Sequence, residues 1–147
     1  MIRRILHPSD FSPASGAAFK KAIEMAKAGR AELMVVHVVS PVVPMAAGEG
    51  YVSPKMYEEI AASTRAWAQK QLDKLLAKAK QAGVRAKGFV LEGSAHEQIA
   101  RFARSKHTDL LVMGTHGRSG LAKLFLGSVA GRVVAAAPCP VLTVRGK

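Results

Sequence analysis

Apolar residues recur along the chain with two alternating patterns, one typical of buried strands and one typical of amphipathic helices. Short apolar runs rich in β-branched residues predict strands at 2–7, 33–39, 84–92, 109–113 and 141–145. Between them, apolar residues spaced three and four apart predict helices at 13–29, 55–82, 94–106 and 127–137. This alternation predicts a parallel sheet with helices on both faces and right-handed crossovers.

Several helix ends carry local signals. Ser12 followed by Pro13 predicts an N-cap and a proline at the first helical position. Gly29 stands where a C-terminal glycine is expected. Ser94 and Glu97 have the spacing of a capping box. We expect Trp67, in the long second helix, to be a core or helix-packing residue.

The segment 40–54 interrupts this regular pattern. Proline and glycine recur through it and exclude regular structure over most of its length. A long loop of this kind is either a lid over a site or a passive crossover, and both interpretations stay open.

Length and composition predict one globular domain spanning 1–147. Apolar residues make up 49% of the chain and charged residues 22%, which excludes extensive disorder. No apolar run approaches the roughly 18 residues of a membrane span, and Asp10, Ser12 and Pro13 interrupt the first apolar run. We therefore expect a cytosolic protein that makes no membrane contact. Cys139 is the single cysteine, so it forms no intrachain disulfide and is expected to be a small buried hydrophobe.

The formal net charge of +12 admits nucleotides, polyanions or an acidic membrane face as partners. Lysine and arginine are spread over the whole chain, aromatic residues are few, and no known DNA- or RNA-binding motif is present. A nucleic-acid-binding function is therefore the least favoured interpretation. After Asp109 the chain carries no acidic residue.

The most informative stretch of the acid-free part is MGTHGRSG at 113–120, which continues to Gly127 and Ser128. Its glycines permit a positive φ and a close approach of the backbone to a ligand. Gly127 and Ser128 then begin a helix, whose N-terminal N–H groups favour an anion. This pattern predicts a phosphate-binding loop, with ordinary turn glycines as the alternative.

In open α/β sheets, ligands bind at the carboxyl ends of the strands, where the winding direction reverses. The first strand ends in His7-Pro8-Ser9-Asp10, the second in His37-Val38, and the fourth at the glycine loop. A carboxylate at Asp10 would face phosphates if the first and fourth strands are neighbours. It would then serve as a metal ligand or as an acceptor for a ribose hydroxyl.

Standard catalytic motifs are missing from the sequence. It contains no Walker A motif, no dinucleotide-binding fingerprint and no G-x-S-x-G elbow. The five histidines lack paired metal-ligand spacing, so no zinc site is predicted.

Over nearly its whole length the chain resembles the universal stress protein family. The matching segments are ILHPSDFS at 5–12, VHV at 36–38 and PCPVL at 138–142. The most specific match is the G-x2-G-x9-G-[S/T] pattern of the ATP-binding branch, formed here by Gly114, Gly117, Gly127 and Ser128. Ala95 departs from a proline that is frequent in the family, and we expect this to have little functional effect.

The resemblance implies a Rossmann-like α/β fold of the adenine nucleotide alpha hydrolase type, a three-layer sandwich whose five parallel strands have the order 3-2-1-4-5. It also implies that the chain binds ATP, accompanied by Mg²⁺. By the same resemblance Pro8 and Asp10 border the nucleoside, with Asp10 near the metal through the phosphates, and Val38 pairs with adenine through its backbone. Met113, Gly114, His116, Gly117 and Arg118 line the ribose and phosphates, and Gly127, Ser128 and Val129 hold the phosphate end.

The family further implies a homodimer in which the terminal strands, here Val141–Val144, pair with each other. An apolar strand at a sheet edge favours such pairing, because its backbone groups are otherwise unpaired.

Two functional hypotheses remain open. One is a regulatory module that binds ATP without turnover as its main role. The other is a slow Mg²⁺-dependent ATPase or phosphotransferase, in which Asp10 holds the metal and His116 or Arg118 stabilises transferred charge.

Overall fold

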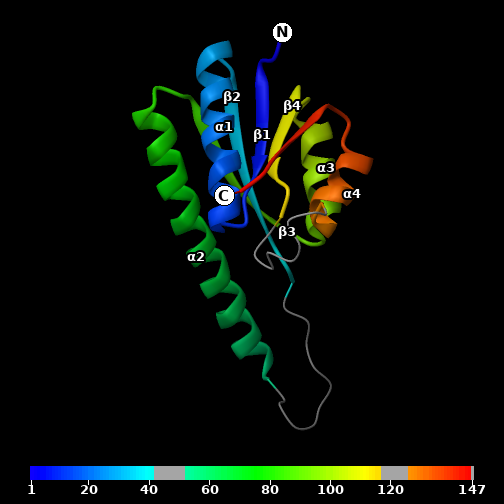
Figure 1. Cartoon of the computed structure of the whole chain (residues 1–147). Helices are drawn as coiled ribbons and strands as arrows, with labels where there is room; N and C mark the ends of the chain where they lie inside the picture. The colour runs from blue at the N-terminus through cyan, green and yellow to red at the C-terminus, as the bar shows by residue number, and fades with distance from the viewer. Residues whose placement is uncertain (42–51, 117–125, 147) are drawn as a thin grey trace.

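A five-stranded parallel sheet runs through the centre of the computed structural model, which describes residues 1–41, 52–116 and 126–146 (Figure 1). The strands lie in the order β3-β2-β1-β4-β5, and every neighbouring pair is parallel. Their bounds are Arg4–Pro8 (β1), Glu32–Val39 (β2), Ala86–Glu92 (β3), Leu110–Gly114 (β4) and Val141–Val144 (β5). The predicted sheet and its strand order are confirmed.

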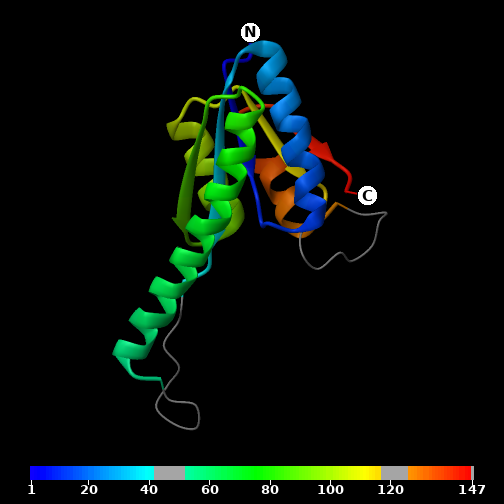
Figure 2. The same cartoon turned by 90° about the vertical axis from the view of Figure 1, so that its left-hand side faces the viewer.

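Four helices connect the strands and cover both faces of the sheet. Their bounds are Pro13–Gly29 (α1), Pro54–Gln81 (α2), Ala95–Ser105 (α3) and Ser128–Ala136 (α4). Helices α1 and α2 lie on one face, and α3 and α4 lie on the other (Figures 1 and 2). The arrangement is the predicted three-layer sandwich.

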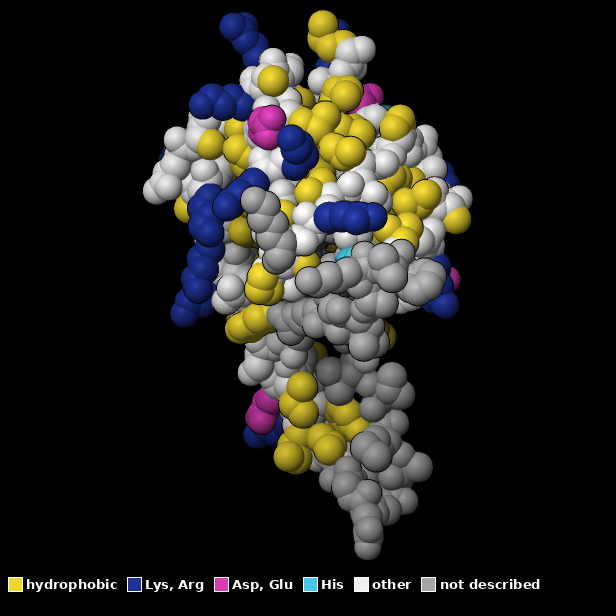
Figure 3. Space-filling view, viewed as in Figure 1, with side chains coloured by type: hydrophobic (Ala, Val, Ile, Leu, Met, Phe, Trp, Pro, Cys, Tyr) yellow, Lys and Arg dark blue, Asp and Glu magenta, His cyan; other side chains and the backbone are white. Residues whose placement is uncertain are grey.

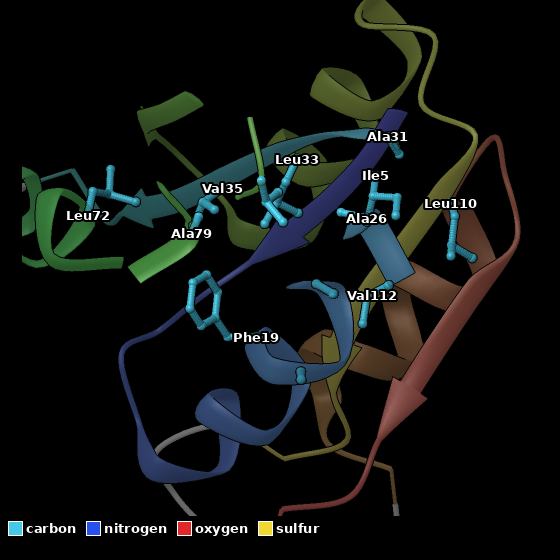
Figure 4. Packing of buried hydrophobic residues seen from close by; sticks show 13 residues of the cluster. Ile5, Phe19, Ala26, Ala31, Leu33, Val35, Leu72, Ala79, Leu110 and Val112 are labelled. Atoms are coloured by element: carbon cyan, nitrogen blue, oxygen red, sulfur yellow. The ribbon is translucent and has the colours of Figure 1, made fainter. Parts of the chain in front are cut away.

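Each central strand divides its apolar residues between two separate cores. Side chains facing α1 and α2 form one core (Figure 4), and the residues next to them in sequence form the other against α3 and α4. The strand residues of the first core are Ile5, Leu33, Val35, Leu110 and Val112. Those of the second are Leu6, Met34, Val36, Leu111 and Met113. Because both faces are buried, the strands are apolar at nearly every position.

The helix starts follow the sequence signals only in part. The Ser12 hydroxyl accepts a hydrogen bond from the Ser15 N–H at 3.2 Å, which confirms the predicted N-cap of α1. The predicted capping box of α3 is wrong, because the Ser94 side chain makes no cap hydrogen bond. Its Oγ lies instead 3.2 Å from Nδ1 of His96, so the hydroxyl is engaged locally. Helix α1 ends at Gly29 as expected, but the left-handed residue is Arg30, with φ of 53°.

The strands β1 and β4 begin later than the apolar pattern suggests. Strand β4 begins at Leu110, because the Asp109 carboxylate accepts hydrogen bonds from the backbone N–H groups of Arg3 and Arg4, both at 2.9 Å. Pairing of β1 with β2 starts at Arg4 opposite Glu32, which leaves Ile2 outside the strand. Strand ends are therefore set here by cross-strand partners.

The N-terminal half of α2 extends past the sheet (Figures 1 and 2). Met56 and Ile60 are exposed on it. Trp67 is 43% exposed and so does not belong to the core, but it packs edge-on against Phe11 with ring centroids 5.5 Å apart, which agrees with the packing role predicted as the alternative. None of the helices in the described segments is long and apolar enough to cross a membrane.

Candidate functional site

A cavity of about 330 Å³ opens at the carboxyl ends of β1, β2 and β4, beside the start of α4. Its volume falls in the range of small-molecule sites. Nine of the eleven predicted site residues line it: Pro8, Asp10, Val38, Met113, Gly114, His116, Gly127, Ser128 and Val129. The other two, Gly117 and Arg118, lie outside the described residues. The cavity occupies the point where the chain reverses its winding direction, between β1 and β4.

The loop after β1 is held by a compact set of hydrogen bonds. The Ser9 N–H donates to the Val36 carbonyl at 2.8 Å, and the Ser9 hydroxyl lies 3.0 Å from that of Ser15. Asp10 accepts a hydrogen bond through Oδ1 from the Ser12 N–H at 2.9 Å. These contacts fix the Asp10 carboxylate at the edge of the cavity.

An aromatic cluster supports the same loop from β2 and α2. The His37 ring stacks on Phe11 with centroids 4.4 Å apart, and its Nδ1 lies 2.7 Å from the Ser9 carbonyl oxygen. Since a carbonyl oxygen only accepts, Nδ1 of His37 carries the proton. Trp67 meets both rings edge-on. Phe11 has a left-handed backbone with φ of 64°, an unusual conformation for a bulky residue.

The segment after β4 is anchored at both described ends. The Thr115 N–H donates to the Val144 carbonyl at 3.0 Å, and the Gly127 N–H donates to the Thr115 carbonyl at 2.7 Å. This second bond brings the start of α4 back to the end of β4. The Thr115 hydroxyl lies 3.0 Å from Nδ1 of His116.

One polar atom at the cavity has no hydrogen-bond partner among the described residues. Nε2 of His116 is buried and makes no hydrogen bond within the part of the chain that the structure describes. When Nδ1 accepts from Thr115, Nε2 carries the proton and is a donor aimed at no described acceptor. A buried polar group of this kind is costly unless it is satisfied, so it suits a ligand oxygen.

The start of α4 provides further donors. Its N-cap is Gly127, no side chain caps it, and no acidic residue lies in its first turn. The first N–H groups of a helix have no partner within the helix. Ser128 and Val129 are exposed and line the cavity, so this helix end favours an anion there.

The described glycines of the loop do not have the positive φ that the sequence led us to expect. Gly127 has φ of −59°, and the positive-φ glycines among the described residues are Gly83 and Gly93. Gly114 therefore also lacks a positive φ. A Cβ at Gly114 would lie 3.4 Å from the His116 carbonyl oxygen, which is van der Waals contact without a clash.

The family model described as the universal stress protein family matches residues 1–145. The chain belongs to the universal stress protein family. It is 40% identical over 147 residues to universal stress protein MJ0531 of Methanocaldococcus jannaschii, a match that covers 99% of this chain and 83% of that protein.

Solved structures agree with the fold of this universal stress protein. The structure of protein MJ0577 of Methanocaldococcus jannaschii superposes with a TM-score of 0.86 at 26% identity, covering 100% of this chain and 98% of the other. A universal stress protein solved in complex with cAMP superposes with a TM-score of 0.73 at 23% identity, covering 99% and 98% of the two chains. At that identity the second likeness shows the fold alone.

The cavity of this universal stress protein is also lined by residues outside the predicted set. They are Ser9, Ser15, Val36, His37, Ala95, Ile99, Thr115 and Ala130. The sequence places His37 at a strand end, yet only the folded chain brings its ring against Phe11. Ser15 gives no signal beyond its place in the first turn of α1.

Cys139 and the described acidic residues provide no separate reactive centre. Burial raises the pKa of the Cys139 thiol, and the Asp109 carboxylate raises it further, so the thiol stays protonated. Cys139 is half-buried rather than fully buried. No group of three or more His, Cys, Asp or Glu in the described segments is arranged to hold a metal ion.

Proposed function

We propose that the protein is a cytosolic ATP-binding universal stress protein domain that acts as a regulatory module, with binding rather than turnover as its main role. The observation that carries this proposal is the cavity itself. It gathers the backbone of β2, the Asp10 carboxylate, the start of α4 and Nε2 of His116, which has no partner among the described residues. This donor and acceptor set suits a ligand with an apolar base at one end and phosphates at the other.

The parts of the nucleotide would divide along the cavity. Val38 presents backbone groups at the end of β2, where the adenine edge would pair, and Pro8 would border the nucleoside. Asp10 would accept from a ribose hydroxyl or approach Mg²⁺ that accompanies the phosphates. Met113, Gly114 and His116, together with Gly117 and Arg118, would line the ribose and phosphates. Gly127, Ser128 and Val129 would hold the phosphate end through the start of α4.

A structural neighbour with the same fold was solved in complex with cAMP, so this fold is compatible with an adenine nucleotide. The absence of acidic residues after Asp109 supports a charged phosphate chain over a neutral ligand, because like charge is not present to repel it. Asp10 is the sole carboxylate among the described residues that line the cavity, and its Oδ1 is already engaged by the Ser12 N–H.

The decisive experiment places a negative charge at the proposed phosphate end. Val129 and Val134 are both exposed on α4, at 40% and 47%, and Val129 lines the cavity whereas Val134 does not. Calorimetric titration with ATP, ADP, AMP and cAMP, with and without Mg²⁺, would be carried out on the wild type, Val129→Glu and Val134→Glu. We expect Val129→Glu to weaken ATP binding at least about tenfold, and AMP binding less, because like charges then meet at the phosphate end.

Val134→Glu changes the net charge equally and should retain wild-type affinity. Absence of ATP binding by the wild type would refute the proposal. Equal affinity of the two variants would refute the placement of the phosphates at α4.

We also propose that the protein forms a homodimer through β5. This strand pairs with β4 on one side and ends the sheet on the other, and its four residues are only half-buried. An edge strand of apolar, β-branched residues favours pairing with another strand. Sedimentation equilibrium at micromolar concentration should give twice the monomer mass, and a monomer mass would contradict this assembly.

A further inference from the structure

The end of the molecule opposite the nucleotide cavity is strongly basic. Because all five strands are parallel and each connecting helix returns antiparallel to them, strand starts and helix ends gather at this end. Ten exposed basic residues lie there, on strand starts, in last helical turns or in the turns between them: Arg3, Arg4, Lys27, Arg30, Lys78, Lys80, Arg85, Lys87, Arg104 and Lys106. We call this set the basic pole. Figure 3 shows lysine and arginine side chains along this upper end of the molecule.

Contacts between neighbouring elements join these residues into one surface. The Arg4 guanidinium donates to the Lys106 carbonyl at 3.1 Å, which connects β1 to the end of α3. The Glu32 N–H donates to the Arg3 carbonyl, and the Leu33 N–H donates to the Arg85 carbonyl, so the starts of β1, β2 and β3 are adjacent. Dispersed along the sequence, the basic residues become contiguous only in the fold.

Acidic residues do little to neutralise this surface. Those that lie at the same strand starts are Glu32 and Asp109. Glu32 is 3.6 Å from Lys87, and Asp109 accepts from two backbone N–H groups. Compensation of helix dipoles explains basic residues in last helical turns, namely Lys27, Lys78, Lys80 and Arg104. It does not explain the basic residues on the strand starts.

The basic pole also contains a groove. An open hollow of about 700 Å³ lies between the end of α2 and the start of β3. Leu76, Ala77 and Ala86 give it an apolar lining, and Lys80, Arg85 and Lys87 stand around it. Glu32 also lines it, and its carboxylate lies 3.6 Å from the Lys87 ammonium group. Shape, apolar lining and positive charge therefore occur together at one place.

We propose that the basic pole is a docking surface for an acidic segment of a partner protein. The segment would seat an apolar side chain in the groove while its carboxylates meet the surrounding lysines and arginines. Charge complementarity selects an acidic partner and speeds its association. The apolar lining favours a peptide over a nucleic acid, because none of the groove residues is aromatic and available for base stacking. A flat membrane surface does not enter a groove.

This surface is independent of the proposed nucleotide function. The two sites lie at opposite ends of the same parallel sheet, so a partner at the basic pole leaves the nucleotide cavity open. Failure of ATP binding would therefore leave the docking proposal standing, and the reverse also holds.

The test uses a short fluorescein-labelled peptide in which glutamates flank a pair of leucines. Its binding to the full chain is measured by fluorescence anisotropy at about 150 mM salt, where distant surface charges are largely screened. Ala77 and Ala66 are both exposed on α2, and only Ala77 lines the groove. Ala77→Glu should raise the peptide Kd at least about tenfold, because it adds a like charge inside the site, whereas Ala66→Glu should change it less than about twofold.

A second pair of variants checks the charges without adding acid. Lys80→Gln with Arg85→Gln removes two groove charges, and Lys55→Gln with Lys70→Gln removes two exposed charges elsewhere. The first should weaken peptide binding and the second should not. Circular dichroism and thermal unfolding of each variant confirm that it is folded.

Three results would overturn the proposal. Equal loss in the matched variants would show that net charge alone attracts the peptide. Equal binding of a peptide with serines in place of leucines would remove the role of the groove. Tighter binding of a single-stranded oligonucleotide of the same charge, or of vesicles containing anionic lipid, would assign the basic pole to a different partner.

Discussion

Nδ1 of His7 donates a hydrogen bond to the carbonyl oxygen of Val112 over 2.9 Å, and so joins a side chain of β1 to the backbone of β4. The ring is fully buried, and its Nε2 has no hydrogen-bond partner in the described segments. Burial lowers the pKa of His7 from 6.5 to about 4, against smaller opposing effects of the Val112 hydrogen bond and the Asp10 carboxylate. The folded protein therefore holds this histidine neutral at pH 7.

The buried His7 predicts a loss of stability in mild acid. The folded pKa of about 4 lies below the unfolded value of 6.5, so the unfolded chain takes up the proton first as the pH falls. Its contribution is complete above about pH 6.5 and decreases towards pH 4, by about 3 kcal/mol in total. Urea unfolding of the wild type and His7→Gln across this range measures it. The prediction would be contradicted if the free energy of unfolding changed equally with pH in the two proteins. It would also be contradicted if NMR showed folded His7 titrating near pH 6.5.

The left-handed backbone of Phe11 predicts an unusual order of stability for two variants at this position. Phe11→Ala and Phe11→Gly both remove the contacts with His37 and Trp67. Glycine also relieves the steric penalty of φ at 64°, so Phe11→Gly should be more stable than Phe11→Ala by about 1 kcal/mol. Urea unfolding of both variants measures the difference. The opposite order, which is usual where φ is negative, would show that this loop relaxes.

The Asp109 carboxylate, at the basic pole, is expected to stabilise the folded protein. Its Oδ2 accepts from the Arg3 and Arg4 N–H groups, and these hydrogen bonds are the main reason that its pKa lies below 3.8. Asp109→Ala should therefore lower the free energy of unfolding by about 1 kcal/mol at pH 7. Its contribution is present above pH 3.8 and is lost as the pH falls through the lower folded pKa. Asp73→Ala, which removes an exposed contact with Gln69, is the control and should cost less.

Asp10 distinguishes nucleotide binding from hydrolysis. If it approaches Mg²⁺, the metal should strengthen ATP binding by the wild type more than by Asp10→Asn, because the amide lacks the charge that attracts the cation. Calorimetric titration with and without Mg²⁺ measures this difference. Phosphate release above the buffer rate that is lost in Asp10→Asn would favour the slow ATPase over the regulatory module. If Mg²⁺ changed ATP affinity equally in both proteins, Asp10 would not lie near the metal.

The sheet and its helices follow from sequence because both depend on local apolar patterns. The runs 33–39 and 109–113 identify buried strands, and parallel connections limit how they are ordered. The site can be predicted from sequence to the extent that it is formed by strand ends, which lie together at one edge of a parallel sheet. Pro8, Val38 and Gly114 lie at or next to the carboxyl ends of three strands that are adjacent in the sheet, so their meeting is a consequence of topology.

Features that depend on side-chain competition could not be predicted in this way. Ser94 has the spacing of a capping residue, but His96 is a competing partner two residues away. Trp67 fits the apolar pattern of α2, yet the helix extends past the sheet and leaves the indole half-exposed. The basic pole is likewise invisible in sequence, because residues such as Arg4 and Lys106 lie 102 positions apart.

The contact between Trp67 and Phe11 gives the protein an intrinsic optical reporter. Trp67 is the single tryptophan of the chain, and its partner belongs to the loop that carries Asp10 to the nucleotide cavity. Tryptophan emission of the unlabelled protein therefore arises from one indole, which contacts that loop through Phe11. A ligand that moves the loop changes the surroundings of this indole, so a fluorescence titration follows the response of the site without any dye or added tag.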